Sequence, residues 1–184
     1  MKLEIETVPA DPSNYGPRGR GPVDTIVIHT TEGSLSSACT WFALDHAPYE
    51  RGPTSAHYVV GQGGRVVRCV EEDRTAFHAG NFPVNLRSIG IEAEGRAADP
   101  ATWTPALMDA LVELCADLVL RYGVPVQRTS AGPGFAGHAD VPHPRDPTRR
   151  GGVGGNVDPG PHFPWVAFLD RLAARLAASP LPVG

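Results

Sequence analysis

The sequence predicts a single α/β domain, with a central mixed β-sheet and helices packed on the sheet faces. Three observations support this prediction. Apolar, β-branched runs that are typical of strands alternate along the chain with amphipathic stretches that are typical of helices. The chain has 184 residues, enough for one sizeable core and too few for two ordinary domains. The sequence also contains no internal repeat.

Composition and charge argue against several classes of protein. The 21 glycines and 19 prolines indicate many turns and long ordered loops. The formal net charge is −4 and no run is rich in lysine or arginine, so we do not expect nucleic acid as a main partner. No apolar run approaches the roughly 18 residues that a membrane span requires.

The amino-terminal end carries no visible signal peptide, because residues 1–6 alternate between polar and apolar side chains. We therefore expect either a chain made in the cytoplasm or a secreted chain given without its leader. Residues 1–22 are rich in proline and glycine and are predicted to form an extended arm. Residues 23–178 would then form the main domain and residues 179–184 a C-terminal tail.

The first predicted strand of the main domain covers residues 23–28, which are apolar or β-branched except for Asp24. Such a run is typical of a strand buried on both faces. It ends at His29, which two threonines, a glutamate and a glycine follow. An imidazole at the end of a buried strand is either a satisfied core histidine or the first residue of a site, and this segment alone leaves both readings open.

A short helix and several strands are predicted next. Ser34 is a suitable N-cap for a helix over residues 34–44. Residues 55–60 and 65–70 read as two strands, and the glycine-rich link between them predicts an antiparallel hairpin. Residues 75–81 are predicted as a short extended piece that runs into a loop.

The strand predicted over residues 88–94 separates two kinds of side chain. Ile89 and Ile91 face one side, and Glu92 faces the other together with small or polar residues. A glutamate on a polar strand face is either solvated or a candidate for proton transfer. Catalysis by zinc needs such a carboxylate beside three protein ligands and an open coordination position.

Two longer helices complete the predicted fold. Thr104 and Pro105 form a cap followed by proline at the first helical position, and the helix is expected to end near Gly123. After residues 134–138, a long loop rich in proline, glycine and arginine reaches residue 161, and a closing helix covers residues 165–178. The residues expected on the apolar faces of the two helices are Leu107, Leu111, Leu114 and Leu118, and Phe168, Leu169, Leu172 and Leu176.

The three cysteines, Cys39, Cys69 and Cys115, are scattered and form no CxxC pair. An odd number without that spacing argues against a disulfide framework or a thiolate zinc site. We expect buried free thiols, with a Cys39–Cys69 bridge left open.

Seven histidines are present, and three of them, His29, His78 and His138, lie at the ends of predicted elements. His57 lies within a predicted strand, where a half-buried structural role is favoured over a place in a groove. No pair of histidines has the spacing of a helical zinc motif. A metal site would therefore have to be assembled from distant segments of the chain.

Six short motifs, taken in order, resemble the zinc-dependent N-acetylmuramoyl-L-alanine amidases, which include the phage-lysozyme-type amidases and are related to the peptidoglycan recognition proteins. Each motif is moderately specific, and the resemblance covers roughly residues 23–170. The motifs are residues 26–33 (IVIHTTEG), 55–60 (SAHYVV), 77–81 (FHAGN), 85–92 (NLRSIGIE), 137–142 (GHADVP) and 156–165 (NVDPGPHFPW).

The resemblance implies a site with one zinc ion. By position, the metal ligands would be His29, His138 and Asp158. Glu92 would take a proton from the attacking water. The family often has a lysine or another polar or basic residue two places before the third ligand, where it helps to stabilise the oxyanion. This chain has Asn156 there, which can donate a hydrogen bond but brings no charge.

The same motifs place His78, Asn81 and Arg87 along a groove that would bind substrate. Arg87 is interpreted equally well as a partner of a stem-peptide carboxylate and as a solvated arginine. Two residues of the long loop, Asp140 and His143, are alternative metal ligands. His162 is interpreted as structural, with a supporting place behind the site as its other reading.

The resemblance therefore implies a hydrolase that cleaves the amide between N-acetylmuramic acid and the L-alanine of the peptidoglycan stem peptide. The expected partner is peptidoglycan or a muropeptide, and we expect a monomer. Cell-wall lysis by a phage enzyme with antimicrobial action, muropeptide turnover and secretion are the settings considered.

Two alternatives remain at this point. One is a recognition module that binds peptidoglycan without cleaving it. The other is a structural zinc protein with a closed site, most simply made of His29, His138, Asp158 and His143.

Overall fold

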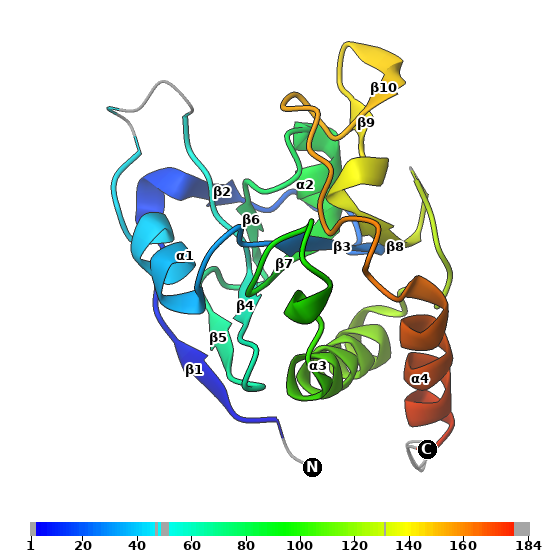
Figure 1. Ribbon diagram of the computed structural model, residues 1–184. Coiled ribbons are helices and arrows are strands. Elements are labelled where there is room, and N and C mark those ends of the chain that lie inside the picture. Colours follow the sequence, from blue (N-terminus) through cyan, green and yellow to red (C-terminus); the bar gives the residue numbers. More distant parts are fainter. Residues whose placement is uncertain (1–2, 47, 49–51, 131, 179–184) are drawn as a thin grey trace.

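A six-stranded mixed sheet forms the centre of the computed structural model, in the order β1-β5-β4-β7-β3-β8 (Figure 1). The structure describes residues 3–46, 48, 52–130 and 132–178. All neighbouring strands of this sheet are parallel except β4 and β5. The predicted α/β domain is confirmed. The strands are β1 (Ile5–Thr7), β3 (Thr25–Thr30), β4 (Tyr58–Val60), β5 (Val66–Arg68), β7 (Ser88–Ala93) and β8 (Gly134–Gly137).

One face of strands β3 and β7, called here the core face, packs against two helices. These are α3 (Pro105–Tyr122) and α4 (Trp165–Ala177), which lie together on one side of the sheet (Figure 1). Successive side chains of a strand point to opposite faces, so alternate residues of each strand reach this layer. The core-face residues Ile26, Ile28, Ile89 and Ile91 are each fully buried.

The opposite face is divided between a helix and a polar region. Helix α1 (Leu35–Phe42) covers the half formed by β4 and β5, where its apolar residues meet Val59 and Val67. On β3 and β7 the same face carries polar residues as well as Val27 and Gly90. We call this part the site face, and its polar residues are Thr25, His29, Ser88 and Glu92.

Capping contacts confirm the predicted start of α1 and both predicted ends of α3, whereas α1 ends at Phe42, two residues earlier than predicted. The Ser34 hydroxyl accepts a hydrogen bond from the Ser37 amide in a capping box at the start of α1. The Thr104 side chain caps α3, and Gly123 ends it with a φ of 69°, a left-handed conformation that glycine adopts without strain. On the inner side of α1, Ala38 and Phe42 are buried, whereas Trp41 is only partly buried.

The predicted hairpin is present with shorter strands, because pairing is limited to Tyr58–Val60 and Val66–Arg68. Outside the central sheet, β6 (Arg74–Ala76) pairs antiparallel with β2 (Tyr15–Pro17) of the N-terminal segment. All three cysteines are buried and free, as expected, with the sulfurs of Cys39 and Cys69 3.9 Å apart.

The described part of residues 1–22 contributes strands as well as extended chain. Strand β1 forms the edge of the central sheet beside β5. Arg18 then connects this segment to the domain: its Nε donates to the carbonyls of Glu72 (2.8 Å) and Arg74 (3.0 Å), its Nη1 to that of Leu86 (2.9 Å) and its Nη2 to that of Ser88 (3.0 Å).

Two short elements lie where the sequence predicted loops. Helix α2 (Phe82–Arg87) begins at the N-cap Asn81, and a hairpin of β9 (Pro142–His143) and β10 (Asp146–Arg150) rises from the long loop. Elements this short carry too little periodicity to be recognised. The predicted tail, residues 179–184, lies outside the described residues. Within the described ranges, no helix is long and apolar enough to cross a membrane.

Candidate metal centre

The site face carries two ionisable side chains at neighbouring positions. His29 of β3 lies opposite Glu92 of β7 in the parallel register. Paired residues of neighbouring strands lie about 4.8 Å apart and point to the same face of the sheet. Every residue of β3 is buried, so the imidazole of His29 is held by a rigid element.

His138 and Asp158 reach His29 from segments that follow β8. His138 begins a 3₁₀ turn directly after β8, and the Ala139 amide donates to the Asp158 carbonyl at 2.8 Å. A Cβ on Gly137 would lie 2.5 Å from the ring of Pro159. Glycine at this position therefore permits the close approach of the two segments.

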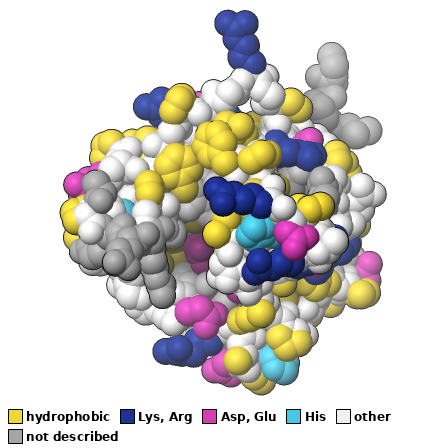
Figure 2. Space-filling view, turned by 90° about the horizontal axis from the view of Figure 1, so that it is seen from above, with side chains coloured by type: hydrophobic (Ala, Val, Ile, Leu, Met, Phe, Trp, Pro, Cys, Tyr) yellow, Lys and Arg dark blue, Asp and Glu magenta, His cyan; other side chains and the backbone are white. Residues whose placement is uncertain are grey.

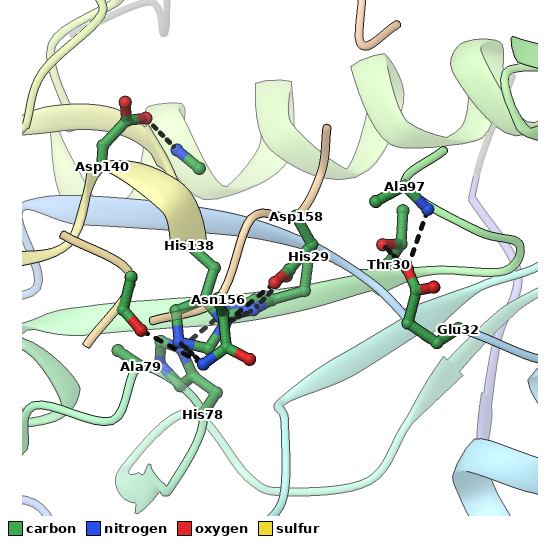
Figure 3. A network of polar contacts seen from close by, with 12 residues as sticks. His29, Thr30, Glu32, His78, Ala79, Ala97, His138, Asp140, Asn156 and Asp158 are labelled. Atoms are coloured by element: carbon green, nitrogen blue, oxygen red, sulfur yellow. Dashed lines mark hydrogen bonds and ion pairs between the residues drawn. The ribbon is translucent and has the colours of Figure 1, made fainter. Parts of the chain in front are cut away.

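The three side chains converge on one point (Figure 3). His29 Nδ1 lies 3.1 Å from His138 Nδ1 and 3.1 Å from Asp158 Oδ2, and His138 Nδ1 lies 3.3 Å from Asp158 Oδ1. Tetrahedral zinc with bonds of about 2.0–2.1 Å separates its ligand atoms by roughly 3.3–3.4 Å. Two imidazole nitrogens and a carboxylate with this spacing fit a zinc ion, and no other such group occurs among the described residues.

The protonation states also suit a metal. Burial lowers the pKa of His29, and the hydrogen bond to Asp158 only partly opposes this effect. Burial would raise the pKa of Asp158, but hydrogen bonds from His138 and His29 outweigh it and hold the pKa well below its usual range. The neutral imidazole that this favours for His29 and the ionised carboxylate of Asp158 are the forms that bind divalent metals.

Glu92 has a buried oxygen that is not hydrogen-bonded. Its Oε2 has no hydrogen-bond partner in the described part of the chain, although the atom is buried. Burial, followed by the negative charges of Asp158 and Glu32, raises the pKa of Glu92 well above its ordinary value. A carboxyl group whose pKa is raised toward the working pH is suited to proton transfer.

Asn156 lies against the second imidazole. Its Nδ2 is 3.1 Å from His138 Nε2 and donates to the Gly151 carbonyl at 3.2 Å. Asn156 is thus beside the cluster, with its amide already engaged on one side.

His78 is brought to the cluster, but its ring is not directed freely into a groove. The residue is buried, with its Nδ1 3.0 Å from His29 Nε2 and its Nε2 3.1 Å from Ser88 Oγ. Burial and the neighbouring histidines lower the pKa of His78 well below its ordinary value, so the ring is neutral.

The other two residues predicted to bind substrate have structural contacts. Asn81 caps α2 through its Oδ1, and its Nδ2 donates to the Pro142 carbonyl at 2.8 Å. Arg87 forms a two-pronged ion pair with Asp24 at 2.7 Å for each contact. The structure does not bring Arg87 to the cluster, because both partners precede their strands while His29 and Glu92 lie near the strand ends.

The alternative ligands lie apart from the cluster. Asp140 accepts a hydrogen bond from Arg128 Nη2 at 2.6 Å, and His143 on β9 accepts one from the Arg145 amide at 3.2 Å. The four-ligand set that includes His143 is therefore not assembled in this structure.

The two remaining histidines with predicted roles differ in burial. His57 is fully buried, and its Nδ1 accepts a hydrogen bond from the Gly90 amide at 3.0 Å, which supports the structural interpretation. His162 is exposed and is followed by the buried Phe163.

A cleft of about 1140 Å³ opens beside the cluster and is bordered by His138 and Asn156. Seen from above, basic, hydrophobic and acidic side chains surround a histidine near the centre of this face (Figure 2). The cleft has mainly apolar walls, contributed by Pro53, Phe77, Phe82, Pro83, Pro144 and Val153. Arg145 adds a cation at its border, on the turn between β9 and β10.

The sequence motifs assigned no role to two contributors to the site. Asn85 accepts hydrogen bonds from the amides of His78 (3.4 Å) and Ala79 (2.8 Å), and Ser88 contacts the His78 ring. The N-cap Asn81 followed by a proline in the first turn was a usable signal for α2, which carries Asn85.

Comparison with known proteins gives a consistent result. Residues 19–161 match the protein family described as N-acetylmuramoyl-L-alanine amidase. The chain is 34% identical over 168 residues to N-acetylmuramoyl-L-alanine amidase A of Achromobacter lyticus, covering 89% of this chain and 90% of that protein. It is 29% identical over 170 residues to the amidase AmiD of Escherichia coli, covering 81% of this chain and 53% of AmiD. The chain thus spans about half the length of AmiD.

Solved structures share the fold. A selenomethionine derivative of AmpD superposes with a TM-score of 0.70 at 24% identity, covering 93% of this chain and 96% of that one. The Staphylococcus aureus hydrolase AmiA, solved with its ligand, gives a TM-score of 0.68 at 17% identity, covering 96% of this chain and 85% of that one. At these identities the likeness shows the architecture alone.

Proposed function

Since this chain belongs to the N-acetylmuramoyl-L-alanine amidase family, we propose that it cleaves peptidoglycan or muropeptides with the help of one zinc ion held by His29, His138 and Asp158. The bond cleaved is the amide between the lactyl group of N-acetylmuramic acid and the L-alanine of the stem peptide. The observation that carries the proposal is the convergence of two imidazole nitrogens and a carboxylate within 4.8 Å of one another.

The donor set supports zinc, and the same residues could hold another divalent ion. When bound, zinc polarises a carbonyl group and lowers the pKa of water toward about 7. The chain supplies the remaining parts of the site. These are a general base for the attacking water, a cleft that binds the substrate and a hydrogen-bond donor to the oxyanion.

Glu92 is proposed as the general base and acid. Its carboxylate takes a proton from the attacking water as the water oxygen bonds to the carbonyl carbon. The same carboxyl group returns a proton to the nitrogen of L-alanine when the carbon–nitrogen bond breaks. The products are a lactyl carboxylic acid and a stem peptide with a free amino terminus. The buried Glu92 Oε2, which has no hydrogen-bond partner in the described chain, supports this assignment.

Asn156 is proposed to donate a hydrogen bond to the oxyanion. Its side chain borders the cleft beside His138, which supports this role. An amide brings no positive charge, so we expect it to stabilise the oxyanion less than a lysine would at this position.

The cleft is proposed to bind the stem peptide along its apolar walls. Among the residues expected to contact substrate, His78 and Asn81 border the cleft but are engaged in contacts within the chain, and Arg87 lies elsewhere. Arg145 is exposed at the border of the cleft and is therefore the better candidate to meet a stem-peptide carboxylate.

Incubation of purified sacculi with the protein tests the proposal. We expect free stem peptides that begin with L-alanine, identified by mass analysis of the soluble products. A chelator should abolish their release, and added zinc should restore it. Disaccharide-peptide products would contradict the proposal, and binding to sacculi without any product would favour the recognition module.

The proposal extends to assembly and setting. We propose that the chain acts as a monomer, which light scattering after size-exclusion chromatography would test. Activity on intact sacculi would indicate a lytic role. Preference for small muropeptides would indicate turnover.

A further inference from the structure

Two of the three cysteines lie side by side. Cys39 belongs to α1, and Cys69 directly follows β5, against which α1 packs. Their sulfurs are 3.9 Å apart. Cys115 lies on α3 in the other core cluster, across the sheet from this pair. Only one pairing of the cysteines is therefore open to the folded chain.

The backbone on both sides of this contact is held in place. The Cys69 amide donates to the His57 carbonyl at 2.8 Å, and the Cys69 carbonyl accepts from the Ala10 amide at 2.8 Å. At the end of α1, the Phe42 carbonyl accepts a hydrogen bond from Asn14 Nδ2 at 2.9 Å. The fold therefore keeps the two sulfurs near each other.

A bond between these sulfurs requires only a small movement. Their separation would have to decrease from 3.9 Å to the disulfide length of about 2.05 Å. Rotation of the two side chains about their Cα–Cβ bonds moves the sulfurs over distances of this order. The backbone hydrogen bonds on both sides can therefore stay in place.

The two thiols differ in reactivity. The hydrogen bond with Cys69 lowers the pKa of Cys39, and the charge of Arg65 acts in the same direction. The same hydrogen bond, together with burial, raises the pKa of Cys69. Because the thiolate is the form that attacks a disulfide, Cys39 is the thiol that reacts first.

Burial determines when the thiols can react. Cys39 and Cys69 are 6% and 4% exposed, so α1 shields both sulfurs while it lies on the sheet. This helix has only eight residues, and both thiols become exposed when it leaves the sheet, as during folding or local opening. We therefore expect the reaction to take place during folding and to be slow in the folded protein.

We propose that Cys39 and Cys69 form a reversible disulfide that links α1 to the sheet when the chain folds in an oxidising environment. The oxidant is a second disulfide, such as oxidised glutathione. The Cys39 thiolate attacks one sulfur of the oxidant and releases the other as a thiolate. The Cys69 thiolate then attacks the Cys39 sulfur of the mixed disulfide and releases the second thiolate. Two cysteine thiols are oxidised to one disulfide, and the oxidant is reduced to two thiols, which take up the two protons.

The bond closes a loop that carries part of the cleft wall. Residues 39–69 include Pro53 and Thr54, which border the cleft. Closing a loop of about 30 residues restricts the unfolded chain, and we expect the melting temperature to rise by about 5–15 °C. Disulfides persist in oxidising compartments such as the bacterial periplasm and cell surfaces, where peptidoglycan lies. This benefit rests on the proposed function, whereas formation of the bond does not.

Mass analysis of the full-length protein tests the pairing. The protein is refolded from urea in a mixture of oxidised and reduced glutathione, its remaining thiols are alkylated and it is digested with trypsin. We expect residues 21–51 to be joined to residues 69–74, with a mass two hydrogen atoms below the sum of the two peptides, and Cys115 to be alkylated. Alkylation of all three cysteines, a bond to Cys115 or glutathione adducts alone would overturn the proposal.

The melting temperature of the metal-free protein tests whether the bond stabilises the fold. Dithiothreitol should lower the melting temperature of the oxidised, unsubstituted chain by about 5–15 °C. C69A should show no such change, and C115A, the matched control, should respond as the unsubstituted chain does. An unchanged melting temperature in the unsubstituted chain would overturn the stabilising role. Neither measurement uses amidase activity, so a chain that forms the bond but releases no stem peptides would contradict the proposed function alone.

Discussion

The two faces of strands β3 and β7 are held together in different ways. On the core face, Ile26, Ile28, Ile89 and Ile91 are fully buried against apolar residues of α3 and α4. On the site face, alternate residues of the same strands include His29, whose Nδ1 lies 3.1 Å from Asp158 Oδ2, and Glu92, whose buried Oε2 has no hydrogen-bond partner in the described part of the chain.

This difference predicts which property of the protein, stability or catalytic chemistry, a substitution on each face should change. Apolar contacts are non-directional, so the core face needs suitable volume and tolerates similar side chains. Buried polar groups on the site face depend on particular partners, and leaving one unpaired, as at Glu92 Oε2, costs about 1–3 kcal/mol. A change on the core face should therefore alter stability, and a change on the site face should alter chemistry.

The largest expected effect is on the site face. E92Q removes the group proposed to transfer protons, and we expect kcat to fall about 10²- to 10⁴-fold with zinc affinity and melting temperature nearly unchanged. Release of stem peptides from sacculi measures the activity. I91V, the neighbouring residue on the core face, is the control and should keep its activity. Substantial activity in E92Q would remove Glu92 from the mechanism.

The next effect is on the core face. I28A, next to His29 in the chain, should lower the free energy of unfolding by about 2–5 kcal/mol, because it deletes buried methyl groups and leaves a cavity. Urea denaturation measures the change. Zinc affinity at a temperature where the variant is folded should stay within a few fold. A tenfold loss of affinity would show that the two faces are coupled.

Acid should destabilise the folded protein through two buried groups, His57 and Glu72, in different pH ranges. Burial, followed by the charge of Arg18, lowers the pKa of His57 from 6.5 to about 3. The unfolded chain therefore takes up this proton first as the pH falls, so stability that is present above pH 6.5 is lost progressively down to about pH 3. H57Q should reduce this loss in urea midpoints measured between pH 7 and pH 4.

At lower pH, we expect stability to be lost through protonation of Glu72, which links the sheet to the end of α3. Burial would raise its pKa, but hydrogen bonds from Arg121, Tyr122 and Tyr58 outweigh this effect and lower the pKa from 4.5 to about 2. Stability present above pH 4.5 is lost toward pH 2. E72Q should flatten that part of the curve alone, and a loss confined to neutral pH would contradict the assignment.

The smallest effect concerns the border of the cleft. R145A removes an exposed cation from the cleft, and we expect KM for a stem-peptide substrate to rise about 2- to 5-fold, since an exposed ion pair contributes about 0.2–1 kcal/mol. R149A is the matched control, because Arg149 is exposed on the same hairpin but does not border the cleft. Equal KM values for the two variants would argue against a substrate contact by Arg145.

The sequence predicted regular elements well and individual roles unevenly. Helical periodicity and capping residues were sufficient to predict α3, and an apolar run was sufficient to predict the buried strand that leads to His29. The order of short motifs correctly brought His29, His138 and Asp158 together, although spacing alone could not. Arg87 was expected along the groove because the same short motif contains Glu92. In the structure the two residues lie at opposite ends of β7, and Arg87 pairs with Asp24.

The contacts that the sequence could not predict depend on side chains from distant segments. Neither the close approach of the His78 ring to Gly90 nor its contact with Ser88 Oγ could be predicted from local periodicity. The hairpin of β9 and β10 was hidden by its prolines and by its short paired length.

The contacts of Arg18 have a practical consequence for where the chain can be shortened. The family match begins at residue 19, one position after the guanidinium that donates to the carbonyls of Glu72, Arg74, Leu86 and Ser88. A fragment trimmed to the matched region would keep every proposed metal ligand and lose these four hydrogen bonds. We expect such a fragment to express poorly or to lose zinc easily, because the Ser88 end of β7 would no longer be anchored. Expression boundaries for this protein are better placed before β1 than at the edge of the sequence match.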